Sequence, residues 1–300
     1  MNFSVHFRSR HSVLAAGVAL SLSALTAVQA ADLRKANPAS KIYVSDVTGE
    51  SQIAIGQKIE DLVKKAVYSV QGTVIETKPK STNSLVYSNG TGIFFDFDTR
   101  VEVRRFQQEP FTPNRTDMEV EPSISQTRAY VVRGLIGICT SKLVAGSNMT
   151  YLTPHASVNI RGRKVVIESN DEVTKISMLE GDSTVYAGSL DVNGRILHDG
   201  EQAVIRTGPP GKLNQMEIEK IPDDQRASLD EKVSMACMAK RTVFFDTRDT
   251  NDQVGNARAN AFANASDDAS GQEIVAITVV PTNVTPDITI SPSTLPGANR

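Results

Sequence analysis

The chain from Ile42 to Arg206 is a succession of short runs in which apolar and polar residues alternate. Gly, Asn, Asp or Pro residues separate one run from the next. Alternation with period two is typical of half-buried β-strands, and regularly spaced short strands are typical of barrels, sandwiches and solenoids. The pattern therefore predicts a short-stranded all-β domain over residues 42–207.

Three stretches of this β-rich part have local features of their own. Residues 57–68 fit helical spacing as well as strand alternation, so both interpretations stay open there. The pair Asn89 and Gly90 predicts a hairpin with a type I′ turn, which needs positive φ at both central residues. The sequence GPPG at 208–211 predicts the end of the β-rich part.

A single amphipathic helix is predicted over residues 222–241. It has a proline and two acidic residues in its first turn and two basic residues at its end. One face carries Leu229, Val233, Ala236, Cys237 and Lys240. We expect this face to pack against the β-domain. Residues 250–300 are rich in Asn, Asp, Ala, Thr and Pro, which predicts a largely disordered tail with one candidate strand at 273–280.

The first thirty residues have the features of a secretory signal peptide. Two arginines precede a short apolar run at 13–28, and small residues precede a cleavage site before Ala31. An uncleaved N-terminal anchor is the alternative, although a membrane span needs about 20 apolar residues. We therefore expect an exported chain with no transmembrane segment after cleavage.

Composition narrows the classes of function. The chain has 32 Lys and Arg residues against 34 Asp and Glu residues, a net charge of −2, with no block of cations. Binding of nucleic acid rests on clustered cations that neutralise phosphates, so we expect no nucleic-acid partner. Tryptophan is absent and aromatic residues make up 5% of the chain, which disfavours a stacking platform for sugars or bases.

Cysteine and histidine are scarce. Cys139 and Cys237 are the only cysteines, and an oxidising compartment permits a disulfide between them that would tie the helix to the β-domain. Two separate buried thiols are the alternative. His155 and His198 are the histidines outside the predicted signal peptide, and we expect both to be exposed loop residues. No motif marks a nucleophile for either histidine or a zinc site, so we expect no catalytic residue, metal or cofactor.

Asp96 and Asp98 are the most plausible acidic pair for chemistry. At period two, both carboxylates would lie on one face of a strand, where they could bind calcium or act as an acid–base pair. The preferred interpretation is the solvent face of a strand whose Phe95 and Phe97 point inward.

Residues from about 42 to 207 resemble the FecR-domain family in its exported, stand-alone form. The resemblance rests on GTVIETKPKSTNSLVYSNGTGIFFDFDTRVEVRRFQQEPF at 72–111, EPSIS at 121–125, TPHASVNIRG at 153–162, and then SMLEGDSTVYAG and ILHDGEQAVI. It implies a solenoid-like or jelly-roll-like β-domain in the periplasm or at the cell surface of a Gram-negative-type bacterium. In the best-known members this domain belongs to a transmembrane regulator that relays a transport signal to an anti-sigma module. We expect no such relay here, because the only long apolar segment is the predicted signal peptide.

One turn of the family pattern departs from the usual sequence. The motif residues, expected to serve structure or an interaction, are Thr153, Pro154, Ile160, Arg161 and Gly162. Gly162 would let the backbone turn where a side chain would obstruct it. The family usually has Thr at the next position, where this chain has Arg163. A contact made by that threonine is therefore not carried over.

These observations together predict a non-enzymatic binding or scaffold module of the bacterial cell envelope. Its partner would be an envelope protein or a surface polymer. Two alternatives remain open: a periplasmic sensory regulator of the FecR type, and an enzyme that acts on envelope glycans with Asp96 or Asp98.

Overall fold

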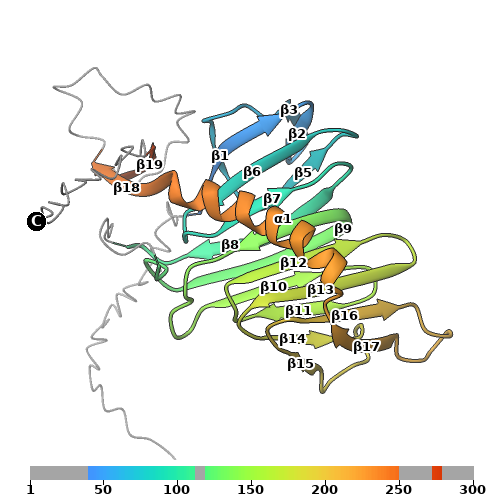
Figure 1. The fold of residues 1–300 in the computed structure, drawn as a ribbon. Helices are drawn as coiled ribbons and strands as arrows, with labels where there is room; N and C mark the ends of the chain where they lie inside the picture. Colours follow the sequence, from blue (N-terminus) through green and yellow to red (C-terminus); the bar gives the residue numbers. More distant parts are fainter. Residues whose placement is uncertain (1–39, 112–118, 250–271, 279–300) are drawn as a thin grey trace, which may run out of the picture. The chain divides into compact units, whose positions relative to one another are not determined.

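The computed structural model describes residues 40–111, 119–249 and 272–278. The predicted signal peptide lies outside the described residues, as do two parts of the predicted tail, 250–271 and 279–300. The described part is an all-β fold with a single helix (Figure 1), as the sequence predicted. No other helix occurs in the described ranges, and none there combines the length and the apolar character needed to cross a membrane.

In the described ranges, seventeen strands form two layers that share the strand β9 (Ser125–Cys139). Sheet A has the order β4 (Val67–Ser69), β1 (Lys41–Thr48), β6 (Thr82–Tyr87), β7 (Gly92–Phe95), β9, β12 (Lys164–Ser169), β13 (Val173–Glu180), β16 (Glu201–Arg206) and β17 (Gln215–Lys220). Sheet B has the order β3 (Lys58–Asp61), β2 (Ser51–Ile55), β5 (Thr73–Thr77), β8 (Arg100–Gln108), β9, β10 (Asn148–Leu152), β11 (Ser157–Ile160), β14 (Ser183–Tyr186) and β15 (Arg195–Leu197).

The chain passes repeatedly between the two layers. Among the described strands of the two layers, all neighbours are antiparallel except β9 and β10, which are parallel. After β9, successive hairpins alternate between the layers: β10–β11 in sheet B, β12–β13 in sheet A, β14–β15 in sheet B and β16–β17 in sheet A. This alternation brings strands from distant parts of the sequence together on each face.

β9 belongs to both sheets. Its residues up to Arg133 pair with β8 in sheet B, and its residues from Gly134 onward pair with β12 in sheet A. Gly134 has a φ of 92°, and a Cβ at this position would overlap Thr99. Only glycine combines this backbone conformation with so close an approach.

The hydrophobic core lies between the two sheets. Ile42, Leu85 and Ile136 point into it from sheet A, and Ile53 and Tyr151 point into it from sheet B. Polar residues alternate with the inward apolar ones along sheet B, as period two predicts. Burial of these side chains supplies the main driving force for folding of the β-domain.

The helix α1 (Asp223–Arg241) covers the outer face of sheet A. Figure 1 shows it running across β6, β7, β9 and β12. Phe94 and Val166 point outward from sheet A and pack against Val233 and Ala236 of the helix. Acidic residues occupy its first turn and basic residues its last turn, which suits the helix dipole. The prediction of an amphipathic helix on the β-domain is confirmed.

Two glycines allow α1 to lie close to sheet A, and a disulfide links the helix to that sheet. A Cβ on Gly92 would overlap the carbonyl oxygen of Ala236, and one on Gly137 would lie 2.7 Å from the carbonyl oxygen of Lys232. The helix backbone therefore lies directly on the backbone of β7 and β9. Next to these contacts, Cys139 and Cys237 form a disulfide with a Cα–Cα distance of 5.1 Å.

The hairpin between β6 and β7 differs from the predicted type I′ turn. Only Gly90 has positive φ, at 81°, and its N–H donates to the carbonyl of Tyr87. Asn89 Oδ1 instead accepts from the N–H of Thr91, and Asn89 Nδ2 donates to Ser125 Oγ. This arrangement is a three-residue loop with glycine in the left-handed position. Asn89 is present for its buried side-chain hydrogen bonds.

Three segments can be compared with their predicted structure. The ambiguous region 57–68 contains the strands β3 and β4. β17 extends the β-domain beyond residue 207, because two half-buried side chains, Met216 and Ile218, continue the core after the GPPG turn. β18 (Val243–Asp249) and β19 (Gln272–Thr278) form a separate two-stranded sheet. β19 therefore confirms the candidate strand predicted at 273–280, where local apolar alternation outweighs the composition of the surrounding tail.

Candidate functional site

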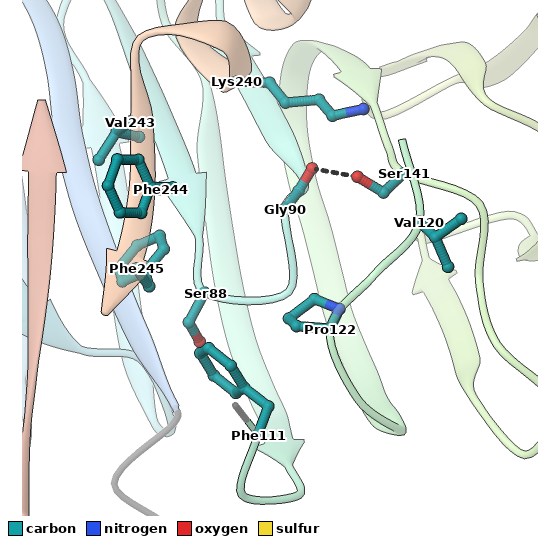
Figure 2. A pocket seen from close by; sticks show the side chains of 10 residues that line it. All are labelled: Ser88, Gly90, Phe111, Val120, Pro122, Ser141, Lys240, Val243, Phe244 and Phe245. Carbon is teal, nitrogen blue, oxygen red and sulfur yellow. Dashed lines mark hydrogen bonds between the residues drawn. The ribbon is translucent and has the colours of Figure 1, made fainter. Parts of the chain in front are cut away.

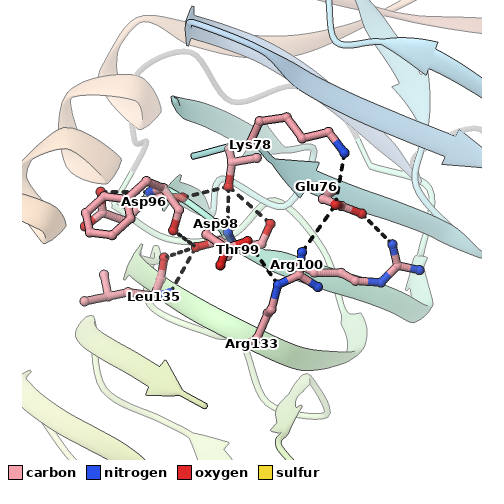
Figure 3. Close-up of polar contacts among 10 residues, drawn as sticks. Glu76, Lys78, Asp96, Asp98, Thr99, Arg100, Arg133 and Leu135 are labelled. Carbon is pink, nitrogen blue, oxygen red and sulfur yellow. Dashed lines mark hydrogen bonds and ion pairs between the residues drawn. The ribbon is translucent and has the colours of Figure 1, made fainter. Parts of the chain in front are cut away.

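Asp96 and Asp98 do not share a strand face. β7 ends at Phe95, and Asp98 has a φ of 48°, so the chain turns between the two carboxylates. Asp96 is buried, and its Oδ2 lies 2.7 Å from Lys232 Nζ on α1. Asp98 is exposed, and its Oδ1 accepts a hydrogen bond of 3.1 Å from Arg133 Nε (Figure 3). Each carboxylate is already paired with a cation of the chain itself.

The side chains beside them also differ from the prediction. Phe95 points into the core as expected, but Phe97 is 59% exposed. The period-two argument failed because the strand ends before Asp96 and the following residues belong to a turn. The expectation that both carboxylates face solvent is therefore wrong for Asp96.

Glu76 is the centre of the ion network shown in Figure 3. Its carboxylate lies 3.1 Å from Lys78 Nζ, 2.6 Å from an Arg100 nitrogen and 3.3 Å from an Arg133 nitrogen. Burial alone would raise the pKa of Glu76, but the hydrogen bonds from Lys78 and Arg100 outweigh it and lower the pKa. The register places Arg100 directly opposite Arg133, so Glu76 bridges two neighbouring cations, and Asp98 supplies a second carboxylate to Arg133.

The two histidines lie in different environments. His155 is buried, in contrast to the prediction, with Nδ1 3.0 Å from Thr174 Oγ1 and Nε2 3.2 Å from the carbonyl of Asp171. His198 is exposed, as expected, with Nδ1 2.9 Å from Asp182 Oδ1. His155 therefore serves as a buried structural residue. Across the described ranges, no three His, Cys, Asp or Glu side chains gather to hold a metal ion.

The first half of the family-motif turn is structural. Thr153 Oγ1 accepts hydrogen bonds from the N–H groups of His155 and Ala156, and the Thr153 N–H donates to the Ala156 carbonyl. Pro154 is the exposed residue at the tip of this turn. Ile160, at the end of β11, is buried in the core.

The second half of the motif reaches the surface. Gly162 has no room for a Cβ, which would overlap Met178 and lie 2.6 Å from the carbonyl oxygen of Glu180. Arg161 precedes it and is exposed. Arg163, which replaces the threonine usual in the family, forms ion pairs with Glu119 and Glu180. Arg161 is therefore the exposed residue of this part of the motif.

A polar hollow of about 390 Å³ lies beside Arg161. The loop between β9 and β10 forms one wall, and the end of β11 forms the other. Asn148, Asn159 and Arg161 provide its polar and charged groups. We call it the loop hollow. The sequence did not predict it, because its walls come from a loop and a strand end that no local pattern brings together.

Buried Glu121 holds the loop wall of this hollow in place. Its carboxylate accepts hydrogen bonds from the Val144 N–H at 2.9 Å, from the Ser125 hydroxyl at 2.9 Å and from the Ser147 hydroxyl. Val144 and Ser147 both line the loop hollow. Burial raises the pKa of Glu121, and the three hydrogen bonds only partly counter it.

The raised pKa predicts a pH-dependent stability that Glu121→Gln removes. Because the folded chain holds the Glu121 proton more tightly than the unfolded chain, this group's contribution to stability is present below the usual carboxyl pKa and is lost as pH rises through the folded pKa. The wild-type melting temperature should therefore fall relative to that of Glu121→Gln as pH rises from 4 toward neutrality. Glu121→Ala, which leaves the Val144 N–H without an acceptor, should cost about 1–3 kcal/mol.

Thermal unfolding followed by circular dichroism across this pH range measures both effects. The glutamine variant is the matched control for size and shape. A difference between wild type and Glu121→Gln that stays constant with pH would contradict the assignment.

The outer face of sheet B carries polar side chains in register. Arg128 lies beside Thr150, Thr150 beside Asn159, and Asn159 beside Thr184, on four neighbouring strands. The Thr150 hydroxyl also hydrogen-bonds Asn159 Oδ1 at 2.6 Å. Arg105 of β8 lies opposite Arg128 and extends the row by one strand. We call these five residues the polar row.

The sequence indicates some of the outward-facing positions of the polar row, but it does not show which of them are neighbours in the sheet. Thr150 and Asn159 each occupy an outward position between inward apolar residues, which alternation identifies, whereas Arg105 follows a bulge at Arg104 that breaks the alternation. Which outward positions lie side by side depends on strand order and register. The parallel pairing of β9 with β10 in particular has no local signal.

A second pocket, shown in Figure 2, is small and largely apolar. It lies between β18, the β6–β7 turn and the segment around Pro122, with Phe244 and Phe245 on one side and Val120 on the other. Its volume of about 50 Å³ holds only a few water molecules. Such a space is a packing gap rather than a site for a small molecule.

Comparison with known proteins gives little further information. No family model matches the chain, and no curated protein matches it. Two solved structures of a "putative anti-sigma factor" from Parabacteroides distasonis match with TM-scores of 0.38 and 0.37 and sequence identities of 13% and 14%. Each match covers 52% of this chain and 62% of the other chain, so this chain spans less than two thirds of those proteins. The likeness is too weak to support an argument about fold or function.

Proposed function

We propose that this chain is an exported, non-enzymatic binding or scaffold module of the bacterial cell envelope, whose partner is an envelope protein or a surface polymer. The observation that carries the proposal is the polar row on the outer face of sheet B. Side chains on a rigid sheet keep fixed spacings, with adjacent strands about 4.8 Å apart. An extended partner lying across the strands would meet a polar group at each step.

The strand edges are less suited to a partner than this face. β3, at one edge of sheet B, carries alternating charges with an ion pair between Lys58 and Glu60, and β15, at the other edge, has three residues. Charged and short edge strands discourage pairing with a further strand. A partner that binds the face rather than extending the sheet fits these edges.

The positions and ion pairs of Asp96 and Asp98 support a binding role over the alternative of a glycan-acting enzyme. Glycosidases place two carboxyl groups across a substrate cleft, with one free to donate a proton. Here Asp96 is buried beneath α1 and paired with Lys232, and Asp98 is paired with Arg133. The alternative of a sensory regulator has only the family resemblance in its favour.

Retention on the native envelope tests the proposal. The chain without residues 1–30 would be incubated with the envelope fraction of its source bacterium, washed at physiological salt and recovered with its bound material. We expect specific retention, with an unrelated exported protein of similar charge as the control. Recovery of no protein or polymer above that control would count against a binding function, and release of soluble glycan fragments would favour an enzyme instead.

A further inference from the structure

We propose that the partner is an extended anionic glycan that lies along the polar row, with its acidic groups at Arg105 and Arg128 and at Arg161. This inference rests on the proposed function, because it names the class of polymer that the same face would bind. The inference is supported by the arginines and by the neutral hydrogen-bonding side chains on the outer face of sheet B.

Two arginines face each other on neighbouring strands without a carboxylate between them. Arg105 and Arg128 are directly opposite in the register of β8 and β9, and both are exposed. Arg105 hydrogen-bonds Gln107 Oε1, an uncharged group, at 3.0 and 2.7 Å. Among the described residues, no ion pair or hydrogen bond reaches the Arg128 guanidinium. Like charges directly opposite each other destabilise a sheet.

The same two strands show how the chain itself neutralises such a pair. Arg100 and Arg133 are also directly opposite, and Glu76 contacts both of them, while Asp98 contacts Arg133. At Arg105 and Arg128 the equivalent anion is absent from the described residues. An acidic group of a bound partner would offset the repulsion between Arg105 and Arg128, as Glu76 does between Arg100 and Arg133.

The surrounding charge favours an anion over this part of the face. Arg104 lies beside the pair, with its guanidinium carbon 4.3 Å from the centre of the Tyr130 ring. Glu102, 3.3 Å from an Arg104 nitrogen, is the nearby carboxylate on β8. The local excess of positive charge contrasts with the net charge of −2 of the whole chain, so it is a property of this face.

The neutral part of the row favours a glycan over other polyanions. From Arg128 the row continues through Thr150, Asn159 and Thr184, whose hydroxyl and amide groups both donate and accept hydrogen bonds. These groups match the hydroxyls of a sugar chain. Asn159 and Arg161 both line the loop hollow, which places a further cation close to the neutral part of the row.

Binding to a defined polymer tests the inference. The probes are polygalacturonate oligomers, the same oligomers with methyl-esterified carboxyl groups, and a single-stranded DNA oligonucleotide of similar charge. The variants are Arg105→Gln with Arg128→Gln, and the charge-matched control Arg206→Gln with Arg226→Gln, whose arginines pair with Glu217 and Asp230 elsewhere on the surface. Affinities would be measured by calorimetry at low and at physiological salt.

We expect wild type to bind polygalacturonate, with an affinity that falls as salt rises. The Arg105/Arg128 variant should bind about tenfold more weakly, as removal of two exposed charge contacts predicts. The control variant should stay within about twofold of wild type. Esterified oligomers should bind poorly, because they lack the acidic groups.

Four results would overturn the inference: no measurable binding of polygalacturonate at low salt, equal affinity of wild type and the Arg105/Arg128 variant, equal affinity for esterified oligomers, or equally tight binding of DNA. The envelope retention assay separates this failure from failure of the proposed function. If the Arg105/Arg128 variant is retained on the native envelope as well as wild type, the glycan inference is wrong and the binding function stands. If wild type itself is not retained, the binding function is wrong as well.

Discussion

Gly92→Ala is expected to lower the free energy of unfolding by about 3 kcal/mol, because one added methyl group would collide with the helix backbone. The new Cβ would overlap the carbonyl oxygen of Ala236 and lie 3.0 Å from its carbonyl carbon. Neither atom can move away without a shift of α1 as a whole. Gly92 does not have positive φ, so the expected loss is steric and does not come from backbone strain.

Equilibrium unfolding in urea measures this loss. Gly72→Ala is the matched control, since a Cβ there meets no atom within 4 Å but the backbone has a φ of 76°. The control should therefore cost roughly 1–2 kcal/mol, the usual penalty for a left-handed conformation. If Gly92→Ala costs no more than Gly72→Ala, α1 does not lie against β7 as described.

Loss of the disulfide is the second large effect. Replacement of both Cys139 and Cys237 by alanine is expected to destabilise the chain by about 2–5 kcal/mol. The bond closes a loop of 98 residues, so its removal gives the unfolded chain much more conformational freedom. It also releases the covalent link between α1 and sheet A, so amides of α1 should lose protection from hydrogen exchange before those of β9.

Denaturation with and without a reducing agent checks this prediction. Reduced wild type should approach the stability of the double alanine variant, and the variant itself should not respond to the reductant. A wild-type protein whose stability is unchanged by complete reduction, verified by thiol counting, would contradict a stabilising role for the bond.

The sequence was informative about strands because alternation is a local property. In sheet B, inward Val101 and Val103 alternate with outward polar residues, and this pattern predicted the strands directly. In sheet A the runs are continuous rather than alternating, as in Ile93, Phe94 and Phe95. The continuity has a physical cause, since Phe94 faces α1 while its neighbours face the core. Continuous apolar runs thus indicate the strands that the helix covers.

The candidate site could not be predicted from the sequence, because its residues become neighbours only through the register of the strands. Arg105 and Arg128 are far apart in the chain, and only the pairing of β8 with β9, across a bulge at Arg104, places them opposite each other. The error at Asp96 has the same origin. Alternation predicts a side chain's direction only while the strand continues, and it gave no warning that β7 ends at Phe95.

The continuity of β9 through both sheets has a mechanical consequence. Arg128 of the polar row lies on the part of β9 before Gly134, and the contacts of β9 with the disulfide-bonded helix lie on the part after it. A pulling force applied to sheet B by a tethered polymer would pass into sheet A along β9 as well as through the loops that connect the two layers. There it would load the hydrogen bonds of β9 with β7 and β12 in shear, so that many bonds resist together. β9 thus forms a continuous covalent connection between Arg128 on the exposed face and the disulfide that links Cys139 to α1.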